Sequence, residues 1–226
     1  MIKILNLNKK YGFNHVLKDI NLKFDKGKVY GIVGDNGAGK TTLFRCIAGL
    51  ADYDGEIESD IVAFKNYLGF LMTEPYFFDL MTGKEYIQLH CNARKREVTN
   101  IDDKNIFDLP LEHYVSTYST GMKKKLALLA ILLQNNQCFL LDEPFNGVDI
   151  HSNIIIVEVI KKLKEMGKLV IIASHIFSTL SDTCDEITLL NEGRIAKTVK
   201  KEDFEELESE MREFSIGDKI DRLGMN

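Results

Sequence analysis

A glycine-rich segment with one lysine and one threonine, GDNGAGKT, occupies residues 34–41. It matches the pattern Gly-x4-Gly-Lys-Ser/Thr, in which glycines let backbone N–H groups come close to phosphate oxygens. Lys40 supplies a positive charge to the β- and γ-phosphates, and the Thr41 hydroxyl can bind Mg²⁺. We therefore predict that this loop binds the phosphates of a nucleotide. The predicted nucleotide-binding residues of the loop are Gly34, Asp35, Asn36, Gly37, Ala38, Gly39, Lys40, Thr41 and Thr42.

A second candidate group lies further along the chain, where an apolar run ends in two carboxylates. Residues 138–141 read as a buried strand, and Asp142 and Glu143 follow it directly. In open α/β sheets ligands bind at the carboxyl ends of strands, so both carboxylates are expected beside the phosphate loop. Asp142 can then reach Mg²⁺, through a water molecule, and Glu143 can polarise an attacking water. The pair therefore predicts hydrolysis of the bound nucleotide.

The elements that must place these groups are predicted from apolar periodicity and turn residues. A strand enters the phosphate loop and a helix leaves it, which is the opening of an α/β unit. Predicted strands cover 2–7, 16–24, 29–33, 138–141, 169–174, 187–190 and 194–199, with more strand within 51–72 that includes 69–72. Predicted helices cover 41–50, the run from 121 to 133, which Ser119 can cap, and 154–166. The polar stretch 76–117 is predicted to be a small, mostly helical insertion, and an acidic helical tail starts at residue 200.

Length and composition narrow the class of protein. The chain has 226 residues, 45% hydrophobic side chains and 28% charged residues, which fits one ordinary globular domain. Its formal net charge of −5 gives no global basic field, so nucleic acid is disfavoured as the main partner. The lysine run 123–125 is predicted to be a solvated helix face.

Apolar runs and cysteines bear on the compartment. No run approaches the ~18 apolar residues that span a bilayer, and the N-terminus lacks the pattern of a signal peptide. The four cysteines include no CxxC pair, which argues against a zinc site or a disulfide framework. A reducing cytosol fits this usage best.

Further motifs follow the order and spacing of the ATP-binding cassette (ABC) transporter family. Residues 118–122, YSTGM, resemble the family's signature sequence in a variant common among exporter-type ATPases. The run 146–149, NGVD, looks like the family's D-loop, and His175 looks like its switch histidine. Tyr11 stands where the family stacks an aromatic ring on adenine. The resemblance runs from about residue 2 to residue 200, nearly the whole chain.

The resemblance implies a fold and a division of the chain. The fold would be the α/β fold of ABC ATPases, a phosphate-loop NTPase with a RecA-like core, an antiparallel β-subdomain and a small α-helical subdomain. A single ATP-binding domain would fill residues 1–226. Within it, 1–72 and 134–200 would form the core with the β-subdomain, about 73–133 the helical subdomain and signature, and 201–226 a helical tail.

The implied function is that of an ATP-binding and ATP-hydrolysing subunit that uses Mg²⁺ and powers transport, leaning to export, through a separate membrane permease. Glu143 would be the general base, and His175 would steady the γ-phosphate. Two cassettes, identical or different, would pair head to tail. The residues implied at the partner's ATP or in the D-loop are Ser119, Thr120, Gly121, Met122 and Asp149. The subunit would lie in the cytoplasm, held to the membrane through the permease, without nucleic acid as a partner.

One position departs from the family pattern. Aligning residues 68–72 with the usual strand places Thr73 where the family has a glutamine that reaches Mg²⁺ or the attacking water, with Glu74 next. Threonine is shorter than glutamine. Either a water bridges Thr73 to the metal, or Glu74 takes the role after a one-residue slip, and the sequence leaves both open.

Two other functions fit the motifs less well. A soluble ABC-type ATPase acting on the ribosome or on DNA usually carries two cassettes or long coiled-coil insertions, and this acidic chain has neither. A non-hydrolysing ATP-dependent binding or regulatory module is left open by Thr73, but Glu143 and His175 argue against it. The transported compound cannot be read from the sequence, because cargo selectivity usually lies in the permease.

Overall fold

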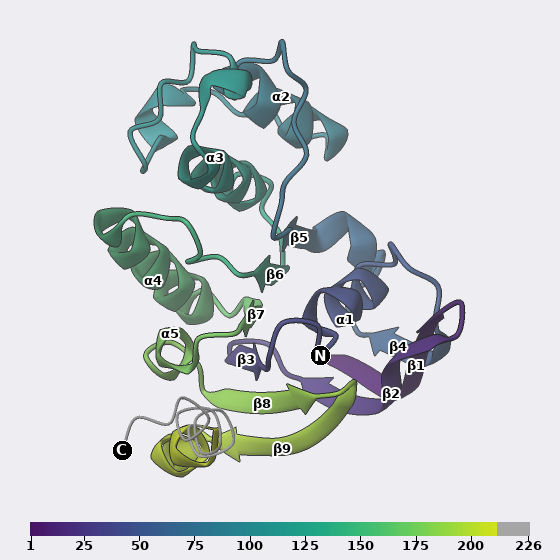
Figure 1. The fold of residues 1–226 in the computed structure, drawn as a ribbon. Coiled ribbons are helices and arrows are strands. Elements are labelled where there is room, and N and C mark those ends of the chain that lie inside the picture. Colours follow the sequence, from purple (N-terminus) through teal and green to yellow (C-terminus); the bar gives the residue numbers. More distant parts are fainter. Residues whose placement is uncertain (212–226) are drawn as a thin grey trace.

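Figure 1 shows the computed structural model of the chain, which describes residues 1–211. Two sheets form the body, and a lobe of helices and loops stands on it. The strands are β1 (Ile2–Tyr11), β2 (Asn14–Phe24), β3 (Val29–Val33), β4 (Asp54–Ser59), β5 (Leu68–Leu71), β6 (Cys138–Asp142), β7 (Leu169–Ser174), β8 (Glu186–Asn191) and β9 (Arg194–Lys200). The helices are α1 (Lys40–Ile47), α2 (Gly83–Ala93), α3 (Thr120–Leu132), α4 (Ile150–Glu165) and α5 (Phe177–Ser181). Short 3₁₀ helices are η1 (Phe64–Tyr67), η2 (Asp102–Lys104), η3 (Val115–Thr117) and η4 (Lys201–Asp203).

The larger sheet has the strand order β5-β6-β7-β3-β8-β9, and all of these strands except β9 run parallel. Every residue of β3, β6 and β7 is buried, as expected when α1 covers one face of a parallel sheet and α4 and α5 cover the other (Figure 1). Val33 pairs with Ser174, and Asp142 pairs with Ala173. The carboxyl ends of these three strands therefore lie side by side, and the segments that follow them meet at one edge.

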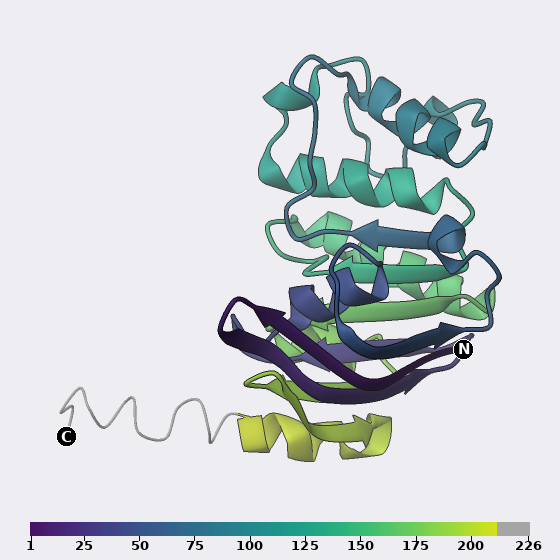
Figure 2. The same cartoon turned by 90° about the vertical axis from the view of Figure 1, so that its right-hand side faces the viewer.

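The smaller sheet is antiparallel, with the strand order β2-β1-β4, and Figure 2 shows it against the larger sheet. Its buried side chains alternate along β1, which is the pattern of a sheet with one covered face. One core cluster contains Ile4 and Leu17 from this sheet, Phe44 from α1, and Leu140 from the larger sheet. Because α1 packs between the two sheets, its N-terminal end is fixed next to the phosphate loop.

The lobe that stands above the sheets in Figures 1 and 2 contains α2, α3 and the irregular chain between them. The prediction of a mostly helical insertion over 76–117 was wrong in extent, because α2 is the only α-helix there. The irregular chain is anchored by Ile101, Phe107 and Leu111, which are buried in the same core cluster as α2 and α3. Scattered apolar anchors and Pro110 suit a packed loop better than a long helix.

Most other predicted elements form, with shifted ends. β7 has the predicted bounds. α4 begins four residues earlier than predicted, because Asp149 caps it by accepting a hydrogen bond from the backbone N–H of Ser152 at 2.9 Å. β1 and β2 extend further than predicted and form a hairpin that closes at Gly12, whose φ is 57°.

Residues 204–211 are helical, and the rest of the predicted helical tail, 212–226, lies outside the described residues. Within residues 1–211, no helix has the length and apolar character needed to cross a membrane.

Candidate nucleotide-binding site

The loop between β3 and α1 bends in ways that require glycine. Gly37 and Gly39 have φ values of 87° and 111°, in the left-handed region that disfavours other residues. A Cβ on Gly39 would also come within 2.8 Å of the Leu17 side chain, and one on Gly34 would collide with the carbonyl of Leu190. The loop therefore packs its backbone directly against β2 and β8. The N-terminal end of α1, which carries the partial positive charge of the helix dipole, begins directly after Gly39, the last glycine of the loop.

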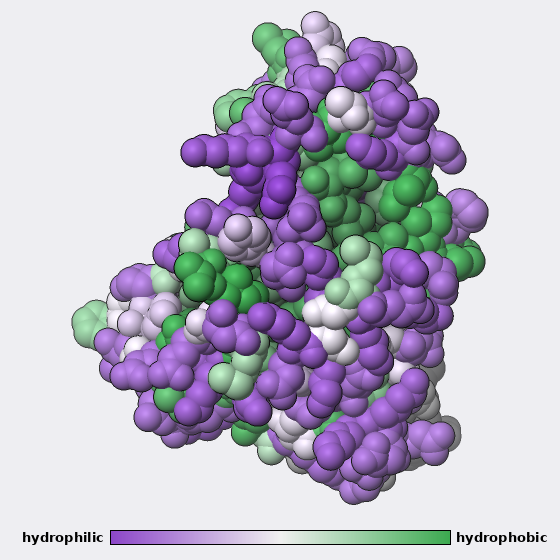
Figure 3. Space-filling view, turned by 180° about the vertical axis from the view of Figure 1, so that it is seen from behind, coloured by the Kyte–Doolittle hydropathy of each residue, from purple (hydrophilic) through white to green (hydrophobic). Residues whose placement is uncertain are grey.

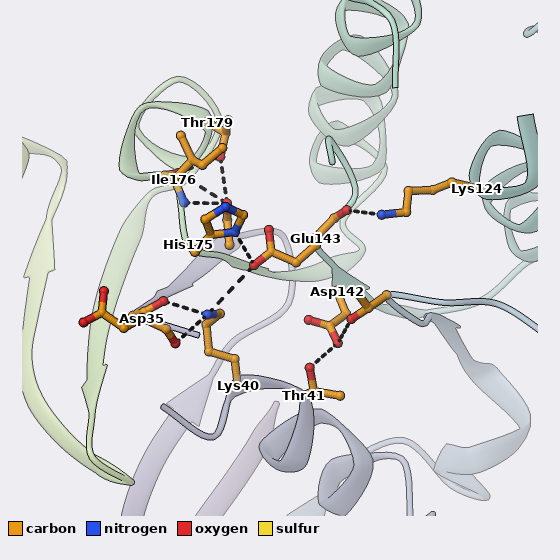
Figure 4. Close-up of polar contacts among 12 residues, drawn as sticks. Asp35, Lys40, Thr41, Lys124, Asp142, Glu143, His175, Ile176 and Thr179 are labelled. Carbon is orange, nitrogen blue, oxygen red and sulfur yellow. Dashed lines mark hydrogen bonds and ion pairs between the residues drawn. The ribbon is translucent and has the colours of Figure 1, made fainter. Parts of the chain in front are cut away.

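Lys40 is buried and folds back over the loop. Its ammonium donates hydrogen bonds to the carbonyls of Gly34 at 2.6 Å and Asp35 at 3.1 Å (Figure 4). It also lies 3.9 Å from Oε1 of Glu143. Burial lowers the pKa of Lys40 from its ordinary value, while the carboxylates of Glu143 and Asp142 oppose that shift. A phosphate entering the loop would offer this cation a better partner than neutral carbonyls.

Asp142 has the features of a magnesium ligand. Its Oδ2 accepts hydrogen bonds from the hydroxyls of Thr41 and Thr73, both at 2.7 Å (Figure 4). Its Oδ1 is buried and has no hydrogen-bond partner among the described residues, so this oxygen is available to a cation. Mg²⁺ takes oxygen ligands, commonly one or two carboxylates together with phosphate oxygens and waters, so this donor set fits it.

Thr73 and Glu74, the two residues considered for the family's glutamine position, differ in their contacts. The Thr73 hydroxyl contacts Asp142 and lines the candidate pocket. The side chain of Glu74 is exposed and does not line that pocket. Of the two, Thr73 is therefore the residue that contacts the predicted metal ligand Asp142, and its role at the metal stays a prediction.

Glu143 is held in an unusual backbone conformation. Its φ is 50°, which is uncommon for a residue with a side chain and is typical of functional sites. Its N–H donates to the carbonyl of Ala173 at 2.9 Å, which ties it to β7. Its Oε1 lies 2.9 Å from Nδ1 of His175, so the carboxylate points to the residue that follows β7 (Figure 4). Groups from the ends of β3, β6 and β7 thus converge, as the strand register requires.

A pocket of about 340 Å³ lies over the phosphate loop. Its lining consists of Tyr11, Val16, Asn36, Gly37, Gly39, Lys40, Thr41, Thr42, Thr73 and Glu143. Tyr11 is 47% exposed, and the Lys9 ammonium lies 4.6 Å from its ring centroid. The structure therefore brings together most of the predicted loop residues, the predicted adenine-stacking ring and the predicted base. Three predicted loop residues are not part of this lining, because Gly34 and Ala38 are buried and the Asp35 side chain is exposed.

The predicted signature residues lie apart from this pocket, at the N-terminal end of α3. Ser119 caps the helix by accepting a hydrogen bond from the N–H of Met122 at 3.2 Å, which confirms the predicted cap. Ser119 and Thr120 are exposed, whereas Gly121 faces the D-loop so closely that a Cβ would collide with the carbonyl of Gly147. Their role across an interface stays a prediction.

Asp149, in the predicted D-loop, makes its contacts with residues of the same chain. It caps α4, and its Oδ2 lies 3.0 Å from the ammonium of Lys125. The N–H and hydroxyl of Ser152, followed by Lys125, hold the pKa of this carboxyl well below its usual range. A further contact with a partner subunit stays a prediction.

The lysine run 123–125 was wrongly predicted to be solvated. Lys124 is 3% exposed, and its ammonium donates to the backbone carbonyl of Glu143 at 2.7 Å (Figure 4). A signal in the sequence could have revealed this burial. Lys124 stands three, four and seven residues before the buried Ala127, Leu128 and Ile131, the spacing of one helix face.

Comparison with known proteins gives concordant matches. A family model described as "ABC transporter" matches residues 17–146. A bacitracin transport ATP-binding protein of Enterococcus faecalis is 30% identical over 231 residues, covering 96% of this chain and 75% of that protein. A lantibiotic transport ATP-binding protein of Streptococcus pyogenes is 29% identical over 225 residues, covering 92% of this chain and 94% of that one.

Solved structures agree with the fold. A dimeric structure of a bacterial ABC transporter cassette superposes with a TM-score of 0.81 at 23% identity, covering 89% of this chain and 99% of that one. A dimeric post-hydrolysis state of an ATP-binding cassette bound to ADP and phosphate gives a TM-score of 0.80 at 23% identity, with the same coverage. At this identity the likeness establishes the fold.

Proposed function

Because this chain belongs to the ABC transporter family, as an ATP-binding and ATP-hydrolysing subunit, we propose that it powers export through a separate membrane permease. The observation that carries the proposal is the meeting of Lys40, Asp142, Glu143 and His175 at one edge of the parallel sheet. Relatives are named for transport of bacitracin, transport of a lantibiotic and resistance to linearmycin. Those names support a peptide or drug-like compound as the cargo.

We expect ATP to lie in the pocket over the phosphate loop, with adenine against the exposed face of the Tyr11 ring. The Lys40 ammonium would exchange loop carbonyls for oxygens of the β- and γ-phosphates. Thr41 and Asp142 would hold Mg²⁺, and Thr73 would keep Asp142 oriented from the other side. Mg²⁺ bound there supplies positive charge that offsets the negative charge of the β- and γ-phosphates.

Glu143 is the proposed general base for hydrolysis. It would take a proton from a water whose oxygen bonds to the γ-phosphorus, while the bond to the β–γ bridging oxygen breaks and ADP leaves. The close contact of Nδ1 of His175 with Oε1, at 2.9 Å, would hold the carboxylate in its direction. The rest of the exposed His175 ring would then steady the γ-phosphate.

The signature residues are proposed to contact ATP that is bound to a second cassette. Backbone N–H groups and the positive end of a helix suit a phosphate anion, and those of α3 start at the exposed Ser119 and Thr120. The chain carries both the phosphate loop and the signature, so a second copy of it can complete two equal sites. A different cassette could fill the same place.

The membrane permease is proposed to contact the lobe that contains α2, which places the subunit on the cytoplasmic face of the membrane. The chain entering α2 exposes Tyr76, Phe78 and Leu80 to 70%, 53% and 82%. Large apolar side chains gathered on a surface in this way are typical of a protein contact. The formal net charge of −5 supports a protein partner rather than nucleic acid.

The substitution Glu143→Gln tests the proposed hydrolysis. It keeps the shape of the side chain but removes its ability to accept a proton at neutral pH. We expect the turnover number for ATP to fall by about 100- to 10,000-fold, the range for loss of a general base. The affinity for ATP, measured with a fluorescent analogue, should stay within about threefold of the parent. Unchanged turnover would remove Glu143 from the role of base.

A further inference from the structure

We propose that Lys124 is a positioning residue for Glu143. Its hydrogen bond to the backbone of Glu143 fixes the direction of the catalytic carboxylate, so that this direction depends on α3, the helix that begins at the signature. The inference rests on the proposed hydrolytic function of Glu143. Lys124 does not itself line the nucleotide pocket. It acts on the backbone of the residue that carries the base.

The contact is short, buried and directed at one atom. The Lys124 ammonium lies 2.7 Å from the carbonyl oxygen of Glu143, and the side chain is 3% exposed. The same carbonyl also accepts from the N–H of Asn146 at 3.2 Å, which closes the turn after β6. Figure 4 shows Lys124 reaching Glu143 from the side opposite to Lys40 and His175.

With this contact, both the backbone N–H and the backbone C=O of Glu143 are held by hydrogen bonds. The N–H of Glu143 is held by the carbonyl of Ala173 at 2.9 Å, and its C=O is held by Lys124. Glu143 adopts a left-handed φ of 50°, a conformation that persists only where the surroundings enforce it. Since the direction of the side chain follows from these backbone angles, release of the carbonyl would let the carboxylate swing away from His175.

The positive charge of the buried Lys124 ammonium strengthens this hydrogen bond. Burial lowers the pKa of Lys124 from its ordinary value, and the nearby carboxylates of Glu143, Asp142 and Glu74 oppose that shift. A hydrogen bond from a charged donor to a carbonyl is stronger than one from a neutral donor. Lys124 therefore holds the turn more tightly than a neutral side chain of similar length would.

The same helix is fastened to the following segment at two more points. Lys125 bonds Asp149 at 3.0 Å and Ser152 at 3.1 Å. Gly121 packs against the carbonyl of Gly147. The N-terminal half of α3 and the segment from Glu143 to the start of α4 thus form one connected unit. A shift of the signature when it meets a partner's ATP would reach the base of the same chain through Lys124.

The test compares Lys124→Met, Lys124→Gln and the control Lys123→Met in the full chain. Met removes the donor and keeps the apolar length, whereas Gln keeps a neutral donor. The ammonium of Lys123 makes no hydrogen bond or ion pair with residues 1–211, so its loss should leave turnover unchanged. Turnover number, KM for ATP, affinity for ATP and melting temperature are measured for each, with the parent and Glu143→Gln alongside.

We expect Lys124→Met to lower the turnover number by about 10- to 100-fold, the cost of misplacing a catalytic group. ATP affinity should stay within about threefold, and Lys124→Gln should recover part of the loss. In the Glu143→Gln background, Lys124→Met should leave ATP-dependent pairing intact, because pairing depends on the phosphate loop and the exposed signature residues, whereas the Lys124 ammonium bonds to Glu143. Turnover like that of the parent would overturn the proposal. So would equal losses of turnover, affinity and pairing, or failure of both variants to fold, since each would show a general structural role. A parent chain that hydrolyses no ATP would instead refute the proposed function itself.

Discussion

Asp142 is the residue whose surroundings indicate most clearly that the site binds a cation. One carboxylate oxygen accepts from Thr41 and Thr73, and the other is buried without a partner in the described part of the chain. A buried unpaired acceptor is costly, so a site that keeps one is built for something that binds there. A cation that takes oxygen ligands would bind this oxygen and balance the negative charge of the carboxylate.

The substitution Thr73→Ala tests how this carboxylate is held. It removes one of the two hydrogen bonds to Oδ2 of Asp142, and loss of such an orienting contact typically weakens a metal site by about 10- to 100-fold. We therefore expect the Mg²⁺ concentration for half-maximal ATPase activity to rise by about tenfold. ATP hydrolysis measured across a Mg²⁺ titration gives this value.

Glu74→Gln is the matched control for that titration. Glu74 is the neighbouring candidate for the family's glutamine position, and its side chain is exposed. Its substitution should leave the Mg²⁺ requirement unchanged. The reverse result, in which Glu74→Gln shifts the titration and Thr73→Ala does not, would assign the position to Glu74.

At the scale of elements, the strands and loops that depend on a few adjacent residues could be predicted from the sequence. The run 169–174 is apolar and β-branched, and β7 forms with those bounds. The phosphate loop and the Asp142-Glu143 pair are each contiguous, so their chemistry is visible in a few residues. That they meet could be predicted because parallel strands share an edge.

Other features could not be predicted because they depend on packing between distant segments. The chain between α2 and α3 is folded by anchors such as Phe107 and Leu111, whose partners lie on other elements. The burial of Lys124 depends on the carbonyl of Glu143, which only the tertiary fold places beneath α3. Charge runs mislead when one member faces a buried polar group rather than water.

The approach of α3 to the D-loop gives a prediction at this scale. A Cβ at Gly121 would collide with the carbonyl of Gly147, so Gly121→Ala must push the start of α3 away. We expect ATPase turnover to fall by about tenfold or more, with ATP affinity within about threefold, because the phosphate loop is untouched. Parallel assays of turnover and binding check this.

Lys123→Ala serves as the control for that substitution. Lys123 lies in the first turn of the same helix, and its ammonium makes no hydrogen bond or ion pair with residues 1–211. It should keep turnover close to that of the parent. Normal turnover in Gly121→Ala would show that the close packing against Gly147 has no part in the activity.

The whole molecule combines a body that holds ATP with a lobe that carries the signature and a hydrophobic surface. The hydrophilic surface seen from behind is interrupted by hydrophobic groups, several of them around the junction of lobe and body (Figure 3). α4 contributes exposed Ile150 and Ile154 to the surface, and the entry to α2 contributes Tyr76 and Phe78. A subunit that works inside a larger complex is expected to show such surfaces.

The double substitution Tyr76→Ser and Phe78→Ser tests whether the permease binds at the entry to α2. These rings pack edge to face with centroids 5.3 Å apart and are largely exposed. Losing two aromatic anchors from an interface should weaken binding by about tenfold or more. We expect less permease to copurify with the variant, while its ATP affinity is unchanged.

Phe13→Ser is the matched control for the docking test. Phe13 is a fully exposed aromatic residue at the β1–β2 turn, on a different part of the molecule. Its loss should leave copurification unchanged. Equal recovery of permease with the double variant and with Phe13→Ser would place the permease contact elsewhere.

The most direct test of the account is the mass of the Glu143→Gln chain in solution with and without MgATP, measured by light scattering. ATP held by the phosphate loop of one copy and the signature of another predicts a shift from one 25.8 kDa chain to a pair when MgATP is added. Adding Ser119→Arg at the exposed signature should abolish the pair and leave ATP bound. A mass that stays at one chain while MgATP is bound would contradict pairing between two copies of this chain, and a pair that survives Ser119→Arg unchanged would contradict the role of the signature.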